Sequence, residues 1–280
     1  TGRPCRRSPL YDTLESSGAV FGEKLGWERA NWFAESGEEA HDIYTFGLPN
    51  WHDAVAREHK AAREAAVLFD QTSFAKYKLS GPDAEQALQW IAANRVDKPV
   101  GTITYTQMLN DKGGIECDLT CVRTKLNEYY ITTGTGYATH DFDWISRNIP
   151  SGLNAQLIDV TSSNAVLSLF GPRARDILQL VTTNDVSHGS HPFGLAKQIC
   201  IAGCPTLAMR ITYVGELGWE LHLPVEFAQT VYNILMTAGS PLGLRNAGYR
   251  AIETLRLEKG YRAWSSDIGP DHTPDEAGLG

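Results

Sequence analysis

Residues 79–88 read Leu-Ser-Gly-Pro-Asp-Ala-Glu-Gln-Ala-Leu, and residues 169–178 read Leu-Phe-Gly-Pro-Arg-Ala-Arg-Asp-Ile-Leu. The two stretches match at an offset of 90 residues at five positions, Leu79/Leu169, Gly81/Gly171, Pro82/Pro172, Ala84/Ala174 and Leu88/Leu178, and Asn94/Asn184 matches at the same offset beyond them. In each copy an apolar run precedes Gly-Pro, and the proline stands where a helix begins, because its missing N–H is not needed there. The chain therefore contains an internal repeat.

Each copy of the repeat continues with strand-like runs and ends in a helix. The strand-like runs are 103–109 and 115–122 in the first copy and 206–213 and 219–223 in the second, and the closing helices fall near 137–148 and 225–238. This order, used twice, predicts an α+β fold of two units with antiparallel sheets.

Three segments are expected along the chain. Residues 1–50 are irregular in pattern and are expected to form a lead-in that packs across a neighbouring surface. Residues 51–155 are expected to form the first α+β unit and residues 156–280 the second. A helix rich in Ala, Glu, Lys and Arg is predicted over 53–67.

Composition excludes several classes of function. The 280 residues include 25 Lys and Arg against 33 Asp and Glu, a formal net charge of −8. This acidic balance argues against nucleic-acid binding, because contact with the phosphate backbone requires a basic face. No apolar run approaches the roughly 18 residues of a membrane helix. No Gly-x-Gly-x-x-Gly occurs, so the segment has no sequence sign of binding FAD or NAD by that route. We therefore expect neither nucleic acid nor a membrane as a partner.

The five cysteines predict no metal site. They are Cys5 and the pairs Cys117/Cys121 and Cys200/Cys204, each of the form C-x3-C. This is not a usual zinc spacing, and no histidine pair completes a site. The odd number of cysteines favours a reducing compartment, and the expected location is the cytoplasm, or the mitochondrial matrix in a eukaryote.

The first hairpin carries a candidate acid, Asp118. After the turn Asn110-Asp111-Lys112-Gly113-Gly114, residues 115–122 run with a period of two. Cys117 falls on the apolar face, whereas Asp118 falls on the polar face near the turn. A solvated strand face would show the same pattern, so position alone does not make Asp118 functional.

The second repeat offers a counterpart in Glu220. Trp219, Leu221 and Leu223 alternate with Glu220 and His222 after the tight connection 214–218. Glu220 is thus an acid on the less apolar face of a hairpin's second strand, and we expect His222 to be a satisfied strand residue. The two hairpins would present Asp118 and Glu220 toward one shared cleft.

These motifs resemble those of the glycine-cleavage T-protein (aminomethyltransferase) superfamily. The matching stretches are Tyr105-Thr-x-Met-Leu-Asn, Gly113-Gly114-Ile-x-x-Asp118, Tyr213-x-Gly-Glu-x-Gly-Trp-Glu220, Leu169-Phe-Gly-Pro, 255–264 and 273–279. Within it, the chain resembles the C-terminal folate-binding region of sarcosine and dimethylglycine dehydrogenases, whose interdomain link is similar to Ser8-Pro9-Leu10-Tyr11, Gly26-Trp27-Glu28-Arg29 and Asn31-Trp32-Phe33. Ser73-Phe74 replaces the His-Met of the T-protein and favours this branch.

The resemblance implies two ferredoxin-like antiparallel-sheet units around a central opening, followed by a C-terminal β-barrel. The chain ends at Gly280, where that barrel would begin, so we expect the barrel to be missing. FAD would belong only to a missing N-terminal flavin domain, the partner in cis. We therefore expect the chain to be a segment of a longer protein.

The resemblance also implies folate-dependent one-carbon transfer. The flavin domain of such dehydrogenases oxidises an N-methyl amine, and tetrahydrofolate captures the one-carbon unit as 5,10-methylenetetrahydrofolate. Asp118 matches the catalytic carboxylate, and Glu220 matches the acid that binds the pterin donor pair. Tyr105, Tyr213 and Phe74 match residues that line the cofactor pocket.

Two points of this assignment stay open. Arg256 would hold the anionic glutamate tail of folate, or it would pair with Glu253 three residues earlier on one helix face. The alternatives to a dehydrogenase domain are a free-standing glycine-cleavage aminomethyltransferase and a non-catalytic regulatory relative of the type found in pyruvate dehydrogenase phosphatase.

The T-protein usually has two adjacent acids where this chain has Cys117-Asp118, and the alternation predicts that Cys117 points into the core.

Overall fold

Five antiparallel strands form the sheet that carries the first repeat, in the order β5-β6-β7-β4-β8. A computed structural model describes residues 2–280, and this sheet belongs to a unit made of Phe74–Thr161, Gly194–Ala196 and Arg262–Gly280, called the first-repeat unit below. Its elements are β4 (Ala75–Ser80), α3 (Ala84–Ile91), β5 (Ile103–Leu109), β6 (Ile115–Lys125), β7 (Glu128–Thr133), α4 (Ala138–Asn148) and β8 (Gln156–Asp159).

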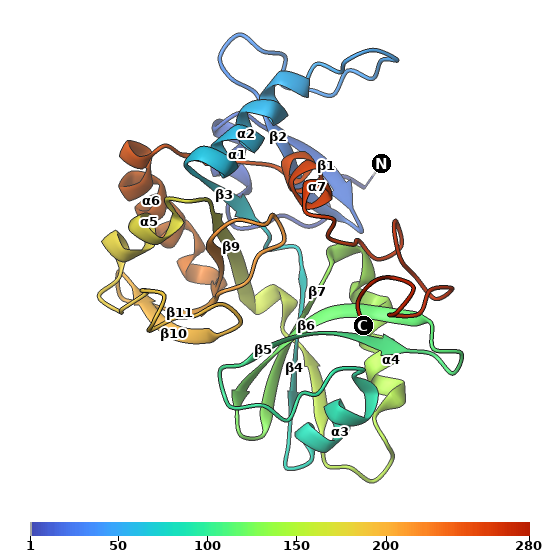
Figure 1. Cartoon of the computed structure of the whole chain (residues 1–280). Helices are drawn as coiled ribbons and strands as arrows, with labels where there is room; N and C mark the ends of the chain where they lie inside the picture. Colours follow the sequence, from blue (N-terminus) through green and yellow to red (C-terminus); the bar gives the residue numbers. More distant parts are fainter. Residues whose placement is uncertain (1) are drawn as a thin grey trace. The chain divides into compact units, whose positions relative to one another are not determined.

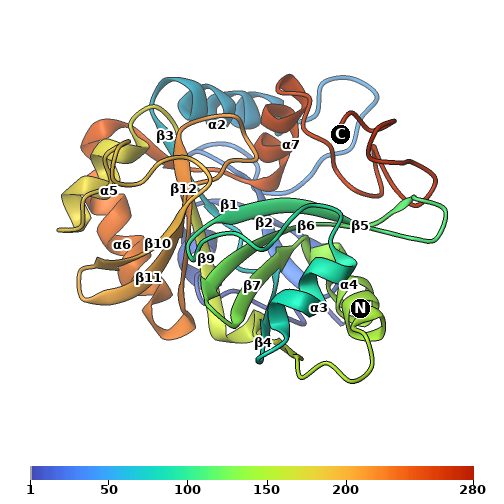
Figure 2. The ribbon, with the colours of Figure 1, turned by 60° about the horizontal axis from the view of Figure 1, so that its bottom comes forward.

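Helices α3 and α4 cover one face of this sheet (Figures 1 and 2). Leu88 of α3 and Ile145 of α4 share one buried cluster with Tyr77, Leu119 and Ile131 of the strands. Alternate strand residues point into this cluster, so the others lie on the opposite face of the sheet. The helix-free face therefore carries the polar residues of the first hairpin.

A second sheet has the order β10-β11-β12-β9-β3-β13. It belongs to the second-repeat unit, made of the chain up to Ser73, Ser162–Phe193 and Lys197–Tyr261. The elements are α1 (Tyr11–Ser16), β1 (Ala19–Lys24), β2 (Trp27–Phe33), α2 (His52–Glu64), β3 (Ala66–Asp70), β9 (Asn164–Phe170), α5 (Ala174–Val181), β10 (Ala196–Ile201), β11 (Cys204–Met209), β12 (Gly218–Pro224), α6 (Ala228–Gly239), β13 (Leu244–Asn246) and α7 (Tyr249–Glu258).

Two layers of helices bury the faces of the second sheet. Helices α5 and α6 lie on one face, where Ile177 and Leu235 pack with Trp219 and Leu221 (Figure 1). Helices α2 and α7 pack on the other face in a cluster with Phe170. The strand pairs are antiparallel, as the sequence predicted, except that β13 runs parallel to β3. The chain passes between the two units more than once, so they are not the contiguous segments 51–155 and 156–280 expected from the sequence.

The repeat is visible in the register of both sheets. Leu79 pairs with Tyr129, and Leu169 pairs with Trp219, so both partners are again 90 residues apart. Strand β12 is therefore the equivalent of β7, whereas β6, which carries Asp118, is the equivalent of β11. The sequence missed β7 and β10, and the expectation that Glu220 is the repeat counterpart of Asp118 is wrong. The sequence did not predict β7, because this strand is buried on both faces and its residues do not alternate between polar and apolar.

Residues 1–50 contain more regular structure than the sequence predicted. They hold α1 and the β1–β2 hairpin, and Leu10 and Trp32 are fully buried. Trp32 also donates from Nε1 to Asp42 Oδ1 at 2.8 Å. The aromatic cluster that suggested a lead-in is thus partly core of the second-repeat unit. The predicted helix 53–67 also ends early, at Glu64, because the apolar run from Ala66 forms β3.

Helix α2 places one carboxylate in the core, that of Glu58. Its Oε1 accepts the backbone N–H of Phe33 at 2.7 Å, and its Oε2 accepts that of Gly248 at 2.9 Å. Burial outweighs these two hydrogen bonds and raises the pKa of Glu58 from 4.5 to about 7. One side chain thus ties α2 to β2 and to the start of α7.

We expect this carboxylate to make the stability of the protein depend on pH. Because the folded state binds the Glu58 proton more tightly than the unfolded state, its stabilisation is complete below about pH 4.5 and is lost as pH rises through about 7. The loss is about 2–3 kcal/mol in the free energy of unfolding. Urea denaturation between pH 4.5 and 8 measures it.

Glu58→Gln should flatten this part of the pH profile. Glu64→Gln, on the exposed face of the same helix, is the matched control and should leave the slope unchanged. An unaltered slope in Glu58→Gln would contradict the assignment.

Candidate functional site

Asp118 lies on the helix-free face of the first-repeat sheet, between two donors from β5. Its Oδ1 accepts a hydrogen bond from Nε2 of Gln107 at 2.8 Å, and Gln107 is its cross-strand partner. The side chain of Tyr105 also hydrogen-bonds to this carboxylate. Tyr105 is 44% exposed, whereas Asp118 is only partly exposed. Two donors on one neighbouring strand therefore hold the carboxylate in place.

The surroundings of Asp118 increase its affinity for a proton. Burial raises the pKa of Asp118 above its ordinary value, and the nearby carboxylate of Asp141 acts in the same direction. The hydrogen bonds from Tyr105 and Gln107 act in the opposite direction without cancelling the effect of burial. A desolvated carboxylate of this kind is the arrangement that acid–base chemistry and cation stabilisation require.

The neighbouring Cys117 points away from this face, as the alternation predicted. Its side chain is 1% exposed and belongs to the core cluster under α3 and α4, together with Leu119 and Cys121. All five cysteines are free. Cys117 stands where the T-protein usually has an acid. Because Cys117 points into the core, Asp118 still provides a carboxylate on the helix-free face.

Glu220 is more buried than the sequence suggested. The period of two is present, since Trp219 and Leu221 lie in the core under α5 and α6 and Glu220 lies on the other face. Yet Glu220 is 8% exposed and His222 is 4% exposed. His222 Nε2 lies 3.4 Å from Oε2 of Glu220, so His222 is a partnered strand residue.

Further polar groups extend the Glu220 face. The cross-strand partner of Glu220 on β9 is Ser168, whose hydroxyl hydrogen-bonds to the side-chain oxygen of Gln71. Sequence reasoning missed Gln107, Gln71 and Ser168, because only strand register places them beside the predicted acids. The second-repeat sheet thus carries a buried polar cluster of Gln71, Ser168, Glu220 and His222.

The other predicted residues are distributed between the two units. In the second-repeat unit, Tyr213 stacks on Tyr261 with ring centroids 6.1 Å apart and planes at 17°. Arg256 is buried at the end of α7, forms an ion pair with Glu253 and donates to the carbonyl of Tyr261 at 2.9 Å. Arg256 thus pairs with Glu253, and its role toward the folate tail stays a prediction.

Phe74 is half-buried just before β4 of the first-repeat unit, the unit that also holds Tyr105 and Asp118. Tyr213, Glu220 and Arg256 belong to the second-repeat unit. The structure brings Tyr105 beside Asp118 within one unit and places Glu220 beside His222 within the other.

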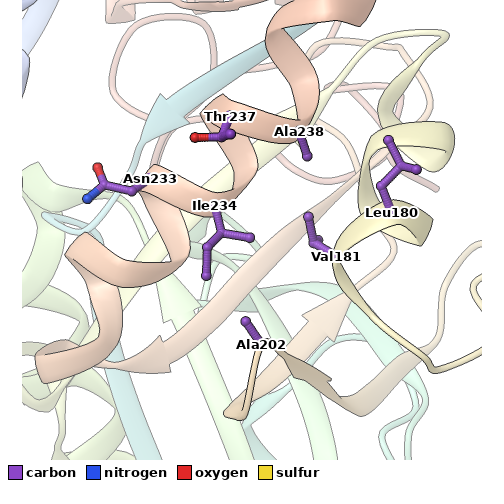
Figure 3. Close-up of a pocket in the computed structure, with 7 residues that line it drawn as sticks. All are labelled: Leu180, Val181, Ala202, Asn233, Ile234, Thr237 and Ala238. Atoms are coloured by element: carbon purple, nitrogen blue, oxygen red, sulfur yellow. The ribbon is translucent and has the colours of Figure 1, made fainter.

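An open apolar cavity of about 500 Å³ in the second-repeat unit is lined by none of these residues (Figure 3). It is formed by α5, α6 and the turn between β10 and β11, and its lining residues are Leu180, Val181, Ala202, Asn233, Ile234, Thr237 and Ala238. None of these lining side chains is titratable. The cavity therefore offers no acid–base chemistry, and the candidate functional residues are those on the polar sheet face of each unit.

The chain belongs to the family described as the GCVT N-terminal domain, whose model matches residues 10–280. This match confirms the resemblance to the T-protein superfamily. The chain is 39% identical to human mitochondrial sarcosine dehydrogenase over 99% of its own length, and 40% identical to the formaldehyde-forming 4-methylaminobutanoate oxidase of Paenarthrobacter nicotinovorans over 100%. It spans 34% of each of these relatives, about a third of their length.

A solved structure supports the fold. Aminomethyltransferase T of the glycine cleavage system from Bartonella henselae superposes on 98% of this chain and 68% of that chain, with a TM-score of 0.81 and 26% identity. The mixed α/β architecture with antiparallel sheets is thus that of the aminomethyltransferases. Among residues 2–280, no helix combines the length and the apolar character that crossing a membrane requires.

Proposed function

We propose that this chain is the tetrahydrofolate-binding, aminomethyltransferase-like domain of a sarcosine or dimethylglycine dehydrogenase-like protein. Tetrahydrofolate, when bound, would capture the one-carbon unit of an N-methyl amine that a flavin domain has already oxidised to an iminium, giving 5,10-methylenetetrahydrofolate and the demethylated amine. The observation that carries the proposal is the desolvated Asp118 carboxylate held between Gln107 and Tyr105. FAD would be held by a flavin domain in cis, outside the present sequence.

Asp118 is the proposed catalytic residue. A carboxylate that is already desolvated and fixed by two donors stabilises a developing cation more strongly than one in water, since it needs no reorganisation. The same carboxylate can accept a proton from a folate nitrogen. Tyr105, exposed beside it, offers an aromatic surface to a flat heterocycle, and Phe74 is proposed to contribute to the same wall.

Glu220 is the proposed pterin ligand. A pterin ring presents an N–H and an exocyclic amine as a parallel donor pair, which one carboxylate can accept. Glu220 is buried, and His222 at 3.4 Å is its only ion-pair partner among the described residues. Tyr213 and Arg256 are the further proposed cofactor-binding residues, with Arg256 acting on the glutamate tail only if it leaves Glu253.

A tetrahydrofolate titration followed by tryptophan fluorescence tests this proposal. We expect saturable binding that Glu220→Gln weakens by about 10- to 150-fold, because hydrogen bonds to a charged group contribute about 1.5–3 kcal/mol. Glu226→Gln, on the surface of the same unit, is the matched control and should bind like the unchanged chain. Equal affinity in Glu220→Gln would contradict the role of Glu220.

The proposed alternatives differ in their one-carbon donor and in folate turnover, which an activity assay with each donor separates. A free-standing glycine-cleavage aminomethyltransferase would bind folate but would act on a lipoyl-bound aminomethyl group rather than an N-methyl amine. A non-catalytic regulatory relative of the pyruvate dehydrogenase phosphatase type would bind folate without turnover, or not at all. The presence of both Asp118 and Glu220 favours a catalytically active domain.

We propose the cytoplasm or the mitochondrial matrix as the location of the protein.

A further inference from the structure

A cysteine, a histidine and an aspartate converge on the core side of the first-repeat sheet. Cys117 projects from β6, and His140 and Asp141 lie in the first turn of α4. The Cys117 sulfur, a ring nitrogen of His140 and a carboxylate oxygen of Asp141 all lie within 4.8 Å of one another. Sulfur, imidazole and carboxylate are the ligand types that zinc combines in proteins.

We propose that Cys117, His140 and Asp141 form a binding site for zinc, with a fourth position open to water. Tetrahedral zinc, with metal–ligand distances of about 2.0–2.3 Å, places its ligand atoms about 3.3–3.8 Å apart. The three atoms therefore need to approach by about 1.5 Å at most, which side-chain rotations supply. Binding forms one Zn–S bond and releases the thiol proton to solvent.

The groups around the three ligands already hold them in position. His140 Nδ1 lies 2.9 Å from Oδ1 of Asp141, and His140 Nε2 lies 3.6 Å from Oε2 of Glu116. When one ring nitrogen of a histidine binds a metal, a carboxylate beside the other orients the ring and increases its basicity. Thr133 Oγ1 donates to Asp141 Oδ2 at 2.5 Å and fixes that carboxylate. Glu116 and Thr133 thus supply the outer contacts typical of zinc sites.

The charge balance also favours a cation. Asp141 is 2% exposed. Its hydrogen-bond and ion-pair partners among residues 2–280 are Thr133, His140 and Cys117, with no lysine or arginine among them. A buried carboxylate is costly unless it is paired or coordinates a metal. The side chain of His140 is 42% exposed and provides the entry path from solvent.

Sequence spacing could not reveal this site. The residues lie 23 and 24 positions apart, on a strand and a helix, and no C-x2-C or His-His pair marks them. Only the packing of α4 against β6 brings them together. The site is separate from the proposed folate chemistry, because Cys117 and Asp118 project to opposite faces of β6, so it stands or falls independently of the proposed function.

Cobalt(II) provides the direct test, since it replaces zinc in tetrahedral sites and a thiolate ligand gives a sulfur-to-cobalt charge-transfer band. Titration of the 280-residue chain with Co²⁺ alone should give this band at one equivalent, and Zn²⁺ should displace it. Cys117→Ser should remove the band. Cys121→Ser, which alters the next buried cysteine on the same strand face, should retain it.

His140→Gln and Asp141→Asn complete the test. Each should weaken Co²⁺ binding at least tenfold, while Asp143→Asn on the exposed face of α4 should not. His140→Gln covers the case in which Cys117→Ser fails to fold, because His140 is exposed and circular dichroism can confirm the native fold. Absence of the charge-transfer band, or a band that persists unchanged in Cys117→Ser or His140→Gln, would overturn the proposal.

Discussion

Replacing Asp118 with asparagine is expected to reduce folate-dependent one-carbon capture by about 10²- to 10⁴-fold, the usual contribution of a positioned acid–base group. Asparagine has the same shape, and its Oδ1 can still accept the hydrogen bond from Gln107. It cannot take up a proton or stabilise a cation through a full charge. The substitution also removes a desolvated carboxylate, so the fold should be retained.

The measurement is the yield of 5,10-methylenetetrahydrofolate relative to free formaldehyde when the proposed dehydrogenase, flavin domain included, is supplied with sarcosine or dimethylglycine. Asp118→Asn should shift the one-carbon product to formaldehyde while amine oxidation continues at its normal rate. Asp111→Asn, on the exposed turn of the same hairpin, is the control and should leave the product ratio unchanged. Normal folate product from Asp118→Asn would refute the catalytic role.

Gly114→Ala is expected to lower the free energy of unfolding by about 3–5 kcal/mol. A Cβ at this position would lie 1.8 Å from the backbone oxygen of Pro270 and 2.8 Å from Nδ2 of Asn110. The backbone around Pro270 would therefore have to move away from residue 114. That movement would break the hydrogen bond from Ile115 N to the oxygen of His272, now 3.0 Å.

Urea denaturation measures the global effect of Gly114→Ala, and limited proteolysis reports release of residues 262–280. The nearby contact from Trp264 Nε1 to the Ile115 oxygen, at 2.8 Å, should be lost in the same step. Gly189→Ala is the matched control, because no atom lies within 4 Å of its Cβ and its φ is not positive. Equal stability of the two variants would show that the segment is not held through this close approach.

The local features of the fold were predictable from the sequence. The alternation of residues 115–122 placed Cys117 in the core and Asp118 on the open face, and both predictions are confirmed. The 90-residue offset predicted the repeated element order, and the paired register of Leu79 and Leu169 now shows it in the sheets. Such features are set by neighbours in the chain, so one sequence is enough to read them.

Some elements were not predicted from the sequence. They are buried on both faces, or they are buried by segments that lie far away in the chain. Strand β7 is buried on both faces, and its sequence Glu-Tyr-Tyr-Ile-Thr-Thr therefore shows no alternation of polar and apolar residues. Tertiary packing also decided that Leu10 and Trp32, in a stretch that looked irregular, belong to the core. A short strand or helix gains most of its stability from contacts that its own sequence does not specify.

The sequence by itself thus determined the class of fold, the repeat, and the face of β6 on which Asp118 stands. Only the tertiary structure decided which groups surround each acid: Gln107 beside Asp118, His222 beside Glu220, and the convergence of Cys117, His140 and Asp141. The reason is that periodicity is a property of neighbouring residues, whereas these contacts depend on strand register and helix packing between segments far apart in the chain.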